Sequence, residues 1–179
     1  MIELVEDKLD IDTYLELRQS VNFRKLTRDQ AKKGLSNSMY TLVAFKDGKA
    51  VGMGRIVGDG AIICYVQDLI IRPEVQGEGI GGLILETLKK FVIQEGYEGT
   101  TMMFDLMCAK GREEFYKKHG FIARPTEDLG PGMIQFIQIG EEGWSVFEKS
   151  PANCNAHLTE SIFQTHSSIV AFYIQCGKI

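Results

Sequence analysis

The sequence predicts a single α+β domain, and three observations support this class. Apolar segments with strand character alternate with amphipathic segments of helical period along the first 140 residues. Two turn pairs, Asp47-Gly48 and Asp59-Gly60, separate three consecutive strands, as tight hairpins require. The chain has 179 residues, a length that suits one well-packed core better than two. We therefore expect an antiparallel meander combined with helices.

Two helices precede the meander. Asp10 or Asp12 is positioned to cap the first, which runs to about residue 20. The second has a clearer start, because Thr27 is followed three residues later by a glutamine, the spacing of a capping box. This second helix is short and is expected to end near Gly34.

The expected element order is β-α-α-β-β-β-α-β-α-β-β. The strands are expected at residues 2–5, 40–45, 51–57, 62–71, 100–107, 121–123 and 133–139. Apolar residues at helical spacing from Ile80 to Val92 predict a long helix that buries one side and ends near Gly96. A short helix is expected over residues 111–118, where Gly120 stops it.

The junction between the third meander strand and the long helix is the most informative segment. It holds the glycines Gly77, Gly79, Gly81 and Gly82. Glycine has no Cβ and tolerates positive φ, so such a loop lets a ligand approach the backbone amides closely. The first N–H groups of a helix lack partners and lie at the positive end of the helix dipole. The junction therefore predicts a phosphate site.

The glycine spacing also fits the dinucleotide fingerprint G-x-G-x-x-G, over Gly77, Gly79 and Gly82. In that fingerprint the first glycine closes the strand directly, whereas here residues 72–76 intervene and a long segment with its own strands and helices comes first. The sequence G-K-[ST] does not follow, which removes the P-loop. A nucleotide-binding oxidoreductase is the lowest-ranked hypothesis.

Two ordered motifs carry a family resemblance. Residues 76–81, Gln-Gly-Glu-Gly-Ile-Gly, fit the signature Q/R-x-x-G-x-G/A, and Phe115 begins a segment that fits F-Y-x-x-x-G-F. With these segments as motifs A and B, most of residues 1–140 resembles the GNAT superfamily of N-acetyltransferases. The resemblance implies a GNAT-like acyl-CoA N-acyltransferase fold with a mixed, mostly antiparallel central sheet of about seven strands flanked by about four helices.

The resemblance implies acetyl-CoA (coenzyme A) as the acyl donor and an amine as the acceptor. Backbone groups on the strand edge are expected to pair with the pantetheine arm, and loop amides are expected to hold the diphosphate. The cofactor-binding residues are then Leu69, Ile70, Ile71, Gln76, Gly77, Glu78, Gly79, Ile80, Gly81 and Gly82. A backbone N–H near Leu69 is the expected stabiliser of the oxyanion.

Tyr116 and Asp68 are the candidate catalytic residues. Tyr116 stands where the motif B tyrosine stands, and a phenol with a pKa of about 10 keeps the proton that a departing thiolate needs. Asp68 is the candidate base for the amine, with a structural salt bridge or a helix cap as the equally weighted alternative. Glu74 and Glu78 are weaker candidates, because acids in loops are usually solvated.

Cys108 and Ala109 mark the limits of the resemblance. Cys108 makes an acyl-cysteine route conceivable, but no histidine lies nearby in the sequence to activate it. Many family members carry an asparagine where Ala109 stands, seven residues before the motif B tyrosine. Lys110 or Arg112 is an alternative contact for the nucleotide phosphates. The departure affects motif B more than motif A.

The acceptor is expected to bind between the first two helices and the later strands. Asn22, Phe23 and Arg55 are the substrate-binding candidates, with Arg24 and the turn before Met133 as further lining. Arg55 suits an acceptor carboxylate, although arginines on strands also make ordinary salt bridges. The leading hypothesis is acetyl transfer to a primary amine of a small molecule by direct attack in a ternary complex. A protein N-terminal or lysine acetyltransferase and a non-catalytic acyl-CoA-binding or regulatory module are the alternatives.

Composition adds several expectations. The net charge of -4 gives no sign of a nucleic-acid or membrane partner. Residues 1–7 lack signal-peptide features and no apolar run has the length of a membrane span, so we expect a cytoplasmic protein. No C-x-x-C spacing and no histidine pairing occur, so no metal is expected and the cysteines are taken as reduced.

The last part of the chain differs from the rest. From residue 151 onward only Glu160 and Lys178 carry full charges, and no helical or strand period persists. We therefore expect a GNAT domain over residues 1–142 and a C-terminal extension over residues 143–179. The extension either packs on the domain, contributes to a homodimer or forms a loosely ordered tail.

Overall fold

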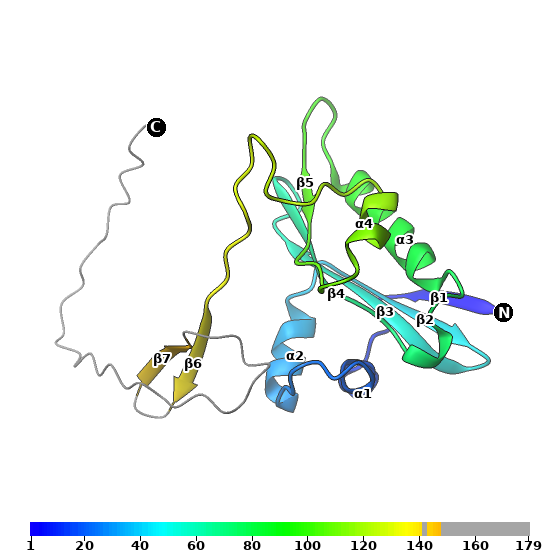
Figure 1. Cartoon of the computed structure of the whole chain (residues 1–179). Coiled ribbons are helices and arrows are strands. Elements are labelled where there is room, and N and C mark those ends of the chain that lie inside the picture. Colours follow the sequence, from blue (N-terminus) through cyan, green and yellow to red (C-terminus); the bar gives the residue numbers. More distant parts are fainter. Residues whose placement is uncertain (141–142, 148–179) are drawn as a thin grey trace. The chain divides into compact units, whose positions relative to one another are not determined.

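The computed structural model describes residues 1–140 and 143–147, and these form two compact units that divide between Pro131 and Gly132 (Figure 1). The helices are α1 (Ile11–Ser20), α2 (Arg28–Ser36), α3 (Ile80–Glu95) and α4 (Glu113–Lys118), with a 3₁₀ turn, η1 (Pro73–Val75), before α3. The strands of the first unit are β1 (Ile2–Glu6), β2 (Tyr40–Lys46), β3 (Lys49–Gly58), β4 (Ile63–Ile71) and β5 (Met103–Asp105). The described strands of the second unit are β6 (Phe136–Gly140) and β7 (Gly143–Phe147).

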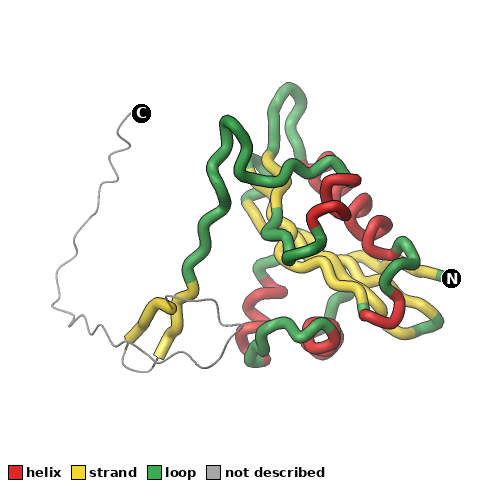
Figure 2. The backbone as a smooth tube through the Cα atoms, viewed as in Figure 1, coloured by secondary structure: helices red, strands yellow, loops and turns green. Residues whose placement is uncertain are grey.

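The five strands of the first unit form one mixed sheet in the order β1-β2-β3-β4-β5. Strands β1 to β4 are an antiparallel meander, as predicted, and β5 returns parallel to β4 after α3. Figure 2 draws the strands in yellow and the helices in red. Strands β6 and β7 pair with each other in a separate antiparallel sheet. The α+β class is thus confirmed, with five strands in the central sheet instead of about seven.

Three strand predictions in the second half differ from the structure. Strand β5 is shorter than residues 100–107, because its pairing with β4 stops at Asp105. Residues 121–123 are not a strand, since the Phe121 ring packs on the rings of Phe104 and Tyr116, at centroid distances of 5.3 and 5.8 Å. The strand expected at residues 133–139 is β6, which pairs with β7, an unpredicted strand close by in sequence. Short loops close at little entropic cost, which favours such a local hairpin.

Side-chain caps fix both helices that precede the meander. The Asp10 carboxylate accepts hydrogen bonds from the backbone N–H groups of Asp12 and Thr13, which resolves the choice of cap for α1. At α2 the capping box is complete, because Thr27 and Gln30 each accept the other's backbone N–H through the side chain. Helix α2 continues slightly beyond Gly34 and ends at Ser36.

Two apolar layers cover the two faces of the sheet. Helix α3 packs on one face, where Ile84 and Leu88 lie among the fully buried side chains, and α1 covers the other face through Tyr14 and Leu17 (Figure 1). Gly54 in β3 makes the α3 layer close, because a Cβ there would lie 2.7 Å from Ile84 Cγ2. Strand glycines of this kind mark a close approach of neighbouring elements.

A β-bulge decides which way the end of β4 faces. Arg55 pairs with Asp68 but Ile56 pairs with Val66, so Gln67 is the extra residue. Before the bulge Val66 packs on the α3 side, and after it Leu69 packs there instead. The bulge therefore turns Asp68 to the face that α1 covers, where simple alternation from Val66 would have placed it under α3.

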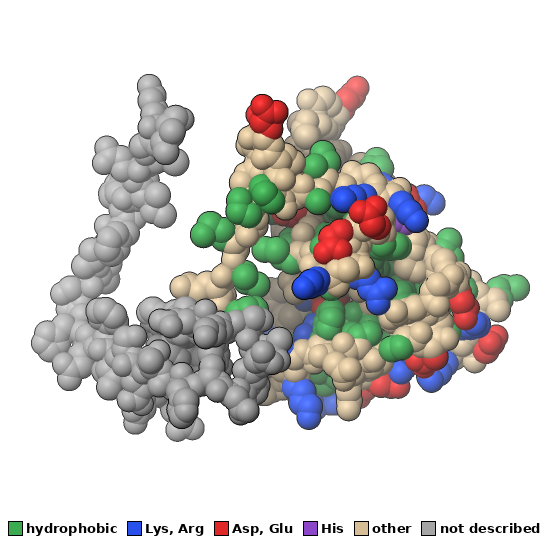
Figure 3. Space-filling view, in the orientation of Figure 1, with side chains coloured by type: hydrophobic (Ala, Val, Ile, Leu, Met, Phe, Trp, Pro, Cys, Tyr) green, Lys and Arg blue, Asp and Glu red, His purple; other side chains and the backbone are tan. Residues whose placement is uncertain are grey.

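The domain boundary predicted after residue 142 stays a prediction, and residues 148–179 of the predicted extension lie outside the described residues. Among the helices that the structure describes, none combines the length and hydropathy needed to cross a bilayer. The face drawn in Figure 3 carries basic and acidic side chains interspersed with one another.

Candidate functional site

A cavity of about 750 Å³ lies beside the C-terminal end of β4. Its walls come from the end of α1, from β4, from the glycine loop with the first turn of α3, and from α4 with the segment that precedes it. The predicted site residues in its lining are Asn22, Phe23, Leu69, Ile70, Ile71, Gln76, Gly77, Gly79, Ile80, Gly81, Gly82 and Tyr116. The other three predicted site residues, Asp68, Glu78 and Arg55, are not part of the lining.

No strand of the described residues pairs with the edge of β4 that faces the cavity. Pairing with β5 covers only Ile63 to Tyr65. Arg72 N–H donates to Val51 O of β3 at 2.8 Å, so by alternation the N–H groups of Leu69 and Ile71 point to the opposite edge. This edge offers backbone donors and acceptors to an extended ligand.

The glycine loop has the backbone conformation that its composition predicts. Gly77 and Gly79 have φ angles of 88° and 83°, in the left-handed region, and a Cβ at either would meet no atom within 4 Å. Glycine is therefore needed at these two positions because of the positive φ angle, and not because neighbouring atoms leave no room for a side chain. Gly79 caps α3 without any side-chain hydrogen bond, so the first N–H groups of the helix remain available to a ligand.

Gly81 and Gly82 have a different function, which is to admit α4. A Cβ at Gly81 would lie 3.4 Å from Phe115 Cζ, and one at Gly82 would lie 3.3 Å from His119 Cε1. A Cβ at Gly82 would require His119 to shift slightly, whereas one at Gly81 would be in ordinary contact with Phe115. The first turn of α3 is thus covered by α4 on one side and open to the cavity on another.

Gln76 and Arg112 connect the two walls of the cavity. Gln76 Nε2 donates to Ile71 O at 2.9 Å, and Gln76 Oε1 accepts from Arg112 Nη2 at 3.2 Å. Of the two basic residues considered for phosphate binding, Arg112 lies in the lining and Lys110 does not. A guanidinium beside an uncapped helix N-terminus is a combination that fits a diphosphate.

Tyr116 lies in the lining and keeps its proton. Its ring meets the rings of Phe115 and Phe121 edge-on, at centroid distances of 5.0 and 5.8 Å. Burial raises the pKa of Tyr116 to about 12, with the Cys108 thiol adding to the shift and the Arg112 charge opposing it. The phenol is therefore protonated throughout the physiological range and is a suitable proton donor.

Cys108 does not have the surroundings of a nucleophile. Its Sγ lies 3.2 Å from Ala109 O, and burial raises the pKa of the thiol. A reactive cysteine needs a lowered pKa, so the acyl-cysteine route is not favoured. Cys64 and Cys108 are both free thiols, while Cys154 and Cys176 lie outside the described residues. Within the described ranges, no group of three or more potential metal ligands occurs.

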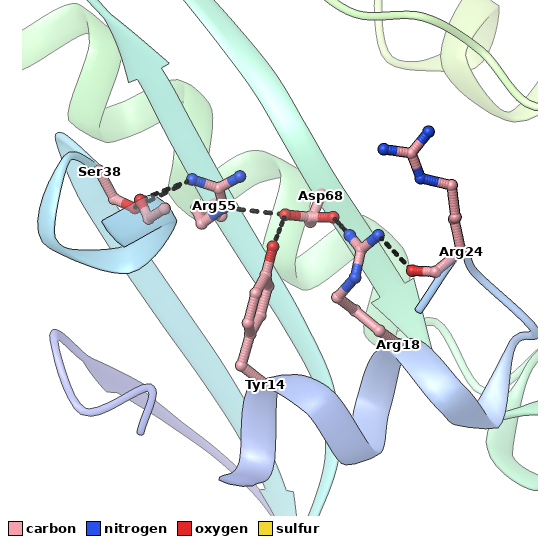
Figure 4. Close-up of polar contacts among 7 residues, drawn as sticks. Tyr14, Arg18, Arg24, Ser38, Arg55 and Asp68 are labelled. Carbon is pink, nitrogen blue, oxygen red and sulfur yellow. Dashed lines mark hydrogen bonds and ion pairs between the residues drawn. The ribbon is translucent and has the colours of Figure 1, made fainter. Parts of the chain in front are cut away.

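Asp68 is enclosed by three donors (Figure 4). Oδ1 accepts from Arg18 Nη1 at 2.6 Å, and Oδ2 accepts from Tyr14 Oη at 3.0 Å and from Arg55 Nε at 2.8 Å. The Asp68 side chain has no solvent exposure. These contacts match the salt-bridge alternative for Asp68 better than the base role, which stays a prediction.

Arg55 belongs to the same cluster. Its Nη1 donates to Gly34 O at 3.1 Å and to Ser38 Oγ at 3.2 Å, and its side chain is 8% exposed. Its hydrogen bonds join β3 to α2 and β4, and its predicted contact with the acceptor stays a prediction. Tyr14 and Arg18 complete the cluster, and neither was identified from the sequence as a candidate site residue. Their i, i+4 spacing puts both on one side of α1, and a polar pair there was the available signal.

The remaining predicted residues lie near the surface. Asn22 has a φ of 57°, which turns the chain after α1, and Phe23 lies 5.2 Å below the Arg18 guanidinium. Glu78 forms an exposed ion pair with Lys46 at 2.6 Å. Its side chain is thus directed to solvent, and only its backbone belongs to the loop.

Comparison with known families agrees with this geometry. Residues 37–123 match the model described as an acetyltransferase (GNAT) domain, and residues 145–173 match a family of unknown function. An uncharacterized N-acetyltransferase, ycf52, of Pyropia yezoensis is 31% identical over 114 residues, which cover 62% of this chain and 63% of the relative. The chain thus spans less than two thirds of that relative.

Two solved structures share the fold at 29% sequence identity. One is a probable acetyltransferase of meticillin-resistant Staphylococcus aureus, with a TM-score of 0.67 over 75% of this chain and 98% of that chain. The other is a GNAT-family acetyltransferase of Streptococcus pneumoniae, with a TM-score of 0.63 over 75% of this chain and 96% of that chain.

Proposed function

Because the chain carries a GNAT acetyltransferase domain, we propose that it transfers the acetyl group of acetyl-CoA to a primary amine of a small molecule. The observation that carries the proposal is the meeting of three features at one cavity. These are the uncapped N-terminus of α3, the unpaired edge of β4, and a tyrosine that holds its proton.

Each feature suits one part of the donor. The amides of residues 76–81 and the Arg112 guanidinium suit the diphosphate, and the edge N–H groups of Leu69 and Ile71 suit an arm that itself carries amides. When bound, acetyl-CoA supplies a thioester that is activated toward amines. The N–H of Leu69 is our candidate donor to the acyl oxygen, because no strand that the structure describes pairs with the edge it points to.

Tyr116 Oη holds the proton that the coenzyme A sulfur needs on departure. Protonation of the sulfur assists its departure, and general acids of this kind contribute about 10²–10⁴-fold. The acceptor amine enters from the wall formed by Asn22 and Phe23, and transfer is direct, in a ternary complex.

The first experiment measures binding of coenzyme A by calorimetry and thiol release from acetyl-CoA with a panel of amines, amino acids and peptides. We expect coenzyme A binding and turnover with small primary amines. Turnover with peptides alone would indicate a protein N-terminal or lysine acetyltransferase. Binding without turnover on the whole panel would indicate a non-catalytic module. Tight binding of a dinucleotide in place of coenzyme A would refute the proposal.

Homodimer formation and a cytoplasmic location are further proposals. One relative, from Arabidopsis thaliana, is named as chloroplastic, so location needs a direct test by cell fractionation. Sedimentation of the full chain tests the oligomeric state, and a single monomeric species would contradict the dimer.

A further inference from the structure

The enclosure of Asp68 raises the question of which group accepts the proton of the amine. An amine must be neutral to attack, and acylation then requires a base within reach of its nitrogen. Both oxygens of Asp68 are already bonded, and its side chain is completely covered. A second carboxylate, Asp105, lies on the neighbouring strand in a very different state.

Asp105 lies where β4 and β5 separate. Its register partner is Tyr65, and this pair is the last one between the two strands. Phe104 and Leu106, on either side of Asp105, both pack in the layer under α3. Because side chains alternate along a strand, Asp105 points to the opposite face, which α1 covers.

Tyr65 shares that face. Its neighbours Cys64 and Val66 are buried under α3, so its ring also points to the α1 side. The loop with Asn22 and Phe23, which lines the cavity, follows α1 on this same side. Asp105 and Tyr65 thus lie where the two strands separate, on the same face of the sheet as that loop, and neither is part of the cavity lining itself.

The Asp105 carboxylate has unused hydrogen-bonding capacity. Its Oδ1 is buried and has no hydrogen-bond partner among the described residues. Such an atom is uncommon in native structures and calls for an explanation, of which a catalytic role is one. Asp68 is the reverse case, since each of its oxygens has a donor.

The surroundings of Asp105 favour proton uptake. Burial raises the pKa of Asp105, and the charge of Arg124 opposes the shift without cancelling it. The Nε of Arg124 is directed to Gly130 O, at 2.6 Å. A carboxylate with a raised pKa is a stronger base than a solvated one.

Tyr65 is the register partner of this carboxylate on β4. Its hydroxyl accepts the N–H of Met107 at 3.1 Å, so its own hydrogen remains free to donate. Burial is the main cause that raises the pKa of Tyr65, and the negative charges of Asp105 and Asp68 add to it. Tyr65 also contributes, as the smallest cause, to the raised pKa of Tyr116.

We propose that Asp105 accepts the proton of the acceptor amine, directly or through one water molecule, a role that rests on the proposed acetyl transfer. The N–H bond breaks, its electron pair stays on nitrogen, and the proton moves to a carboxylate oxygen of Asp105. Tyr116 gives one proton to the sulfur, and the Asp105 proton returns to Tyr116 through solvent. A neutral amine and a thioester thus yield an amide and a thiol with no net change in protons.

Thermal unfolding of the full chain tests the state of the carboxylate without any substrate. A folded-state pKa that is raised above the unfolded value makes the ionised side chain unfavourable in the fold at neutral pH. Asp105→Asn should therefore have a Tm equal to or above that of the wild type at pH 7, and the difference should shrink as the pH falls to about 4. Asp68→Asn, the matched control, should lower the Tm at both pH values.

Turnover with an amine that the protein acetylates tests the role of Asp105 as the proton acceptor. Asp105→Asn and Asp105→Ser should bind coenzyme A within about twofold of the wild type, lose about 100-fold or more in kcat, and lose the rise of kcat/KM with pH. Asp105→Glu should recover part of the rate. Tyr65 and Arg124 are the titratable and charged groups near Asp105, and Tyr65→Phe should retain the pH dependence.

A kcat of Asp105→Asn within about threefold of the wild type would overturn the role, as would a loss of Tm equal to that of Asp68→Asn. A wild type that binds coenzyme A and acetylates none of the amines counts against the proposed function itself. The two failures are therefore distinguishable.

Discussion

The glycine loop and the Asp68 cluster differ in how far their polar groups are hydrogen-bonded within the protein. In the loop, the cap residue Gly79 supplies no side-chain acceptor, and no side chain of the described residues caps the first amides of α3 beside the cavity. In the cluster, Asp68 accepts three hydrogen bonds, and Arg55 uses its donors on Asp68, Ser38 and a backbone oxygen. Groups without partners are available to a ligand, whereas groups bonded within the protein stabilise the fold. One atom of the cluster departs from this contrast, since Arg18 Nε is buried and has no hydrogen-bond partner among the described residues.

The charge of the cluster explains its structural importance. Two guanidinium groups, from Arg18 and Arg55, share one carboxylate in a place almost closed to solvent. The contacts join α1, α2, β3 and β4 (Figure 4). An arginine that lost its partner there would remain charged and poorly hydrated.

The largest effect should come from removing the shared carboxylate. Asp68→Ala leaves two buried arginines without a counter-charge, and we expect a loss of about 3–5 kcal/mol in the free energy of unfolding. Urea denaturation measures it. The control is Asp12→Ala, which breaks an exposed pair with Arg28 and should cost less than about 1 kcal/mol. Equal losses in the two variants would contradict the contrast between the regions.

The second effect concerns turnover. Tyr116→Phe should lower kcat by about 100-fold or more and leave coenzyme A affinity nearly unchanged, because it removes a proton donor and little contact area. The protonated form is lost only as the pH rises through a pKa of about 12, so no alkaline decline from Tyr116 should occur up to about pH 10. A wild-type rate in Tyr116→Phe, in an assay limited by chemistry, would remove the tyrosine from its role.

The third effect tests the backbone of the loop. Gly79→Ala forces a Cβ into a left-handed conformation, with a φ of 83°, and should cost about 1–2 kcal/mol of stability. Coenzyme A affinity should fall by about tenfold if the helix start shifts, and Gly79→Val should weaken it further. Gly34→Ala is the matched control, since that glycine lies inside α2 with open space around it. It should be neutral or stabilising by up to about 1 kcal/mol.

The smallest effect should come from Glu78. Glu78→Ala removes an exposed ion pair with Lys46 but keeps the backbone N–H that we assign to phosphate binding. Stability should change by less than about 1 kcal/mol, and coenzyme A affinity should stay within about twofold, as calorimetry can verify. A large loss of affinity would mean that the side chain, and not the main chain, contacts the ligand.

Local patterns predicted the first half of the fold well. The capping box at Thr27 and the turn pair Asp47-Gly48 appear in the structure where the sequence places them, because each depends only on neighbouring residues. Strand partners are a non-local property, and here prediction failed. Residues 121–123 have strand composition, yet Phe121 finds aromatic neighbours in place of a strand.

The same limit applies to the site. The glycine spacing located the loop, and the motif located Tyr116 in the cavity lining. No pattern indicated that Gln67 is a bulge, and the bulge decides that Asp68 faces α1. Nor did the sequence single out Asp105, whose buried oxygen without a partner is visible only in three dimensions.

The sequence by itself predicted most of the helices and strands, the glycine loop and the resemblance to the GNAT superfamily, since these depend on composition and spacing along the chain. Only the tertiary structure decided which acid is enclosed and which retains an unused oxygen. The reason is physical: the basicity of a carboxylate depends on the donors and the solvent around it, and residues distant in sequence supply both.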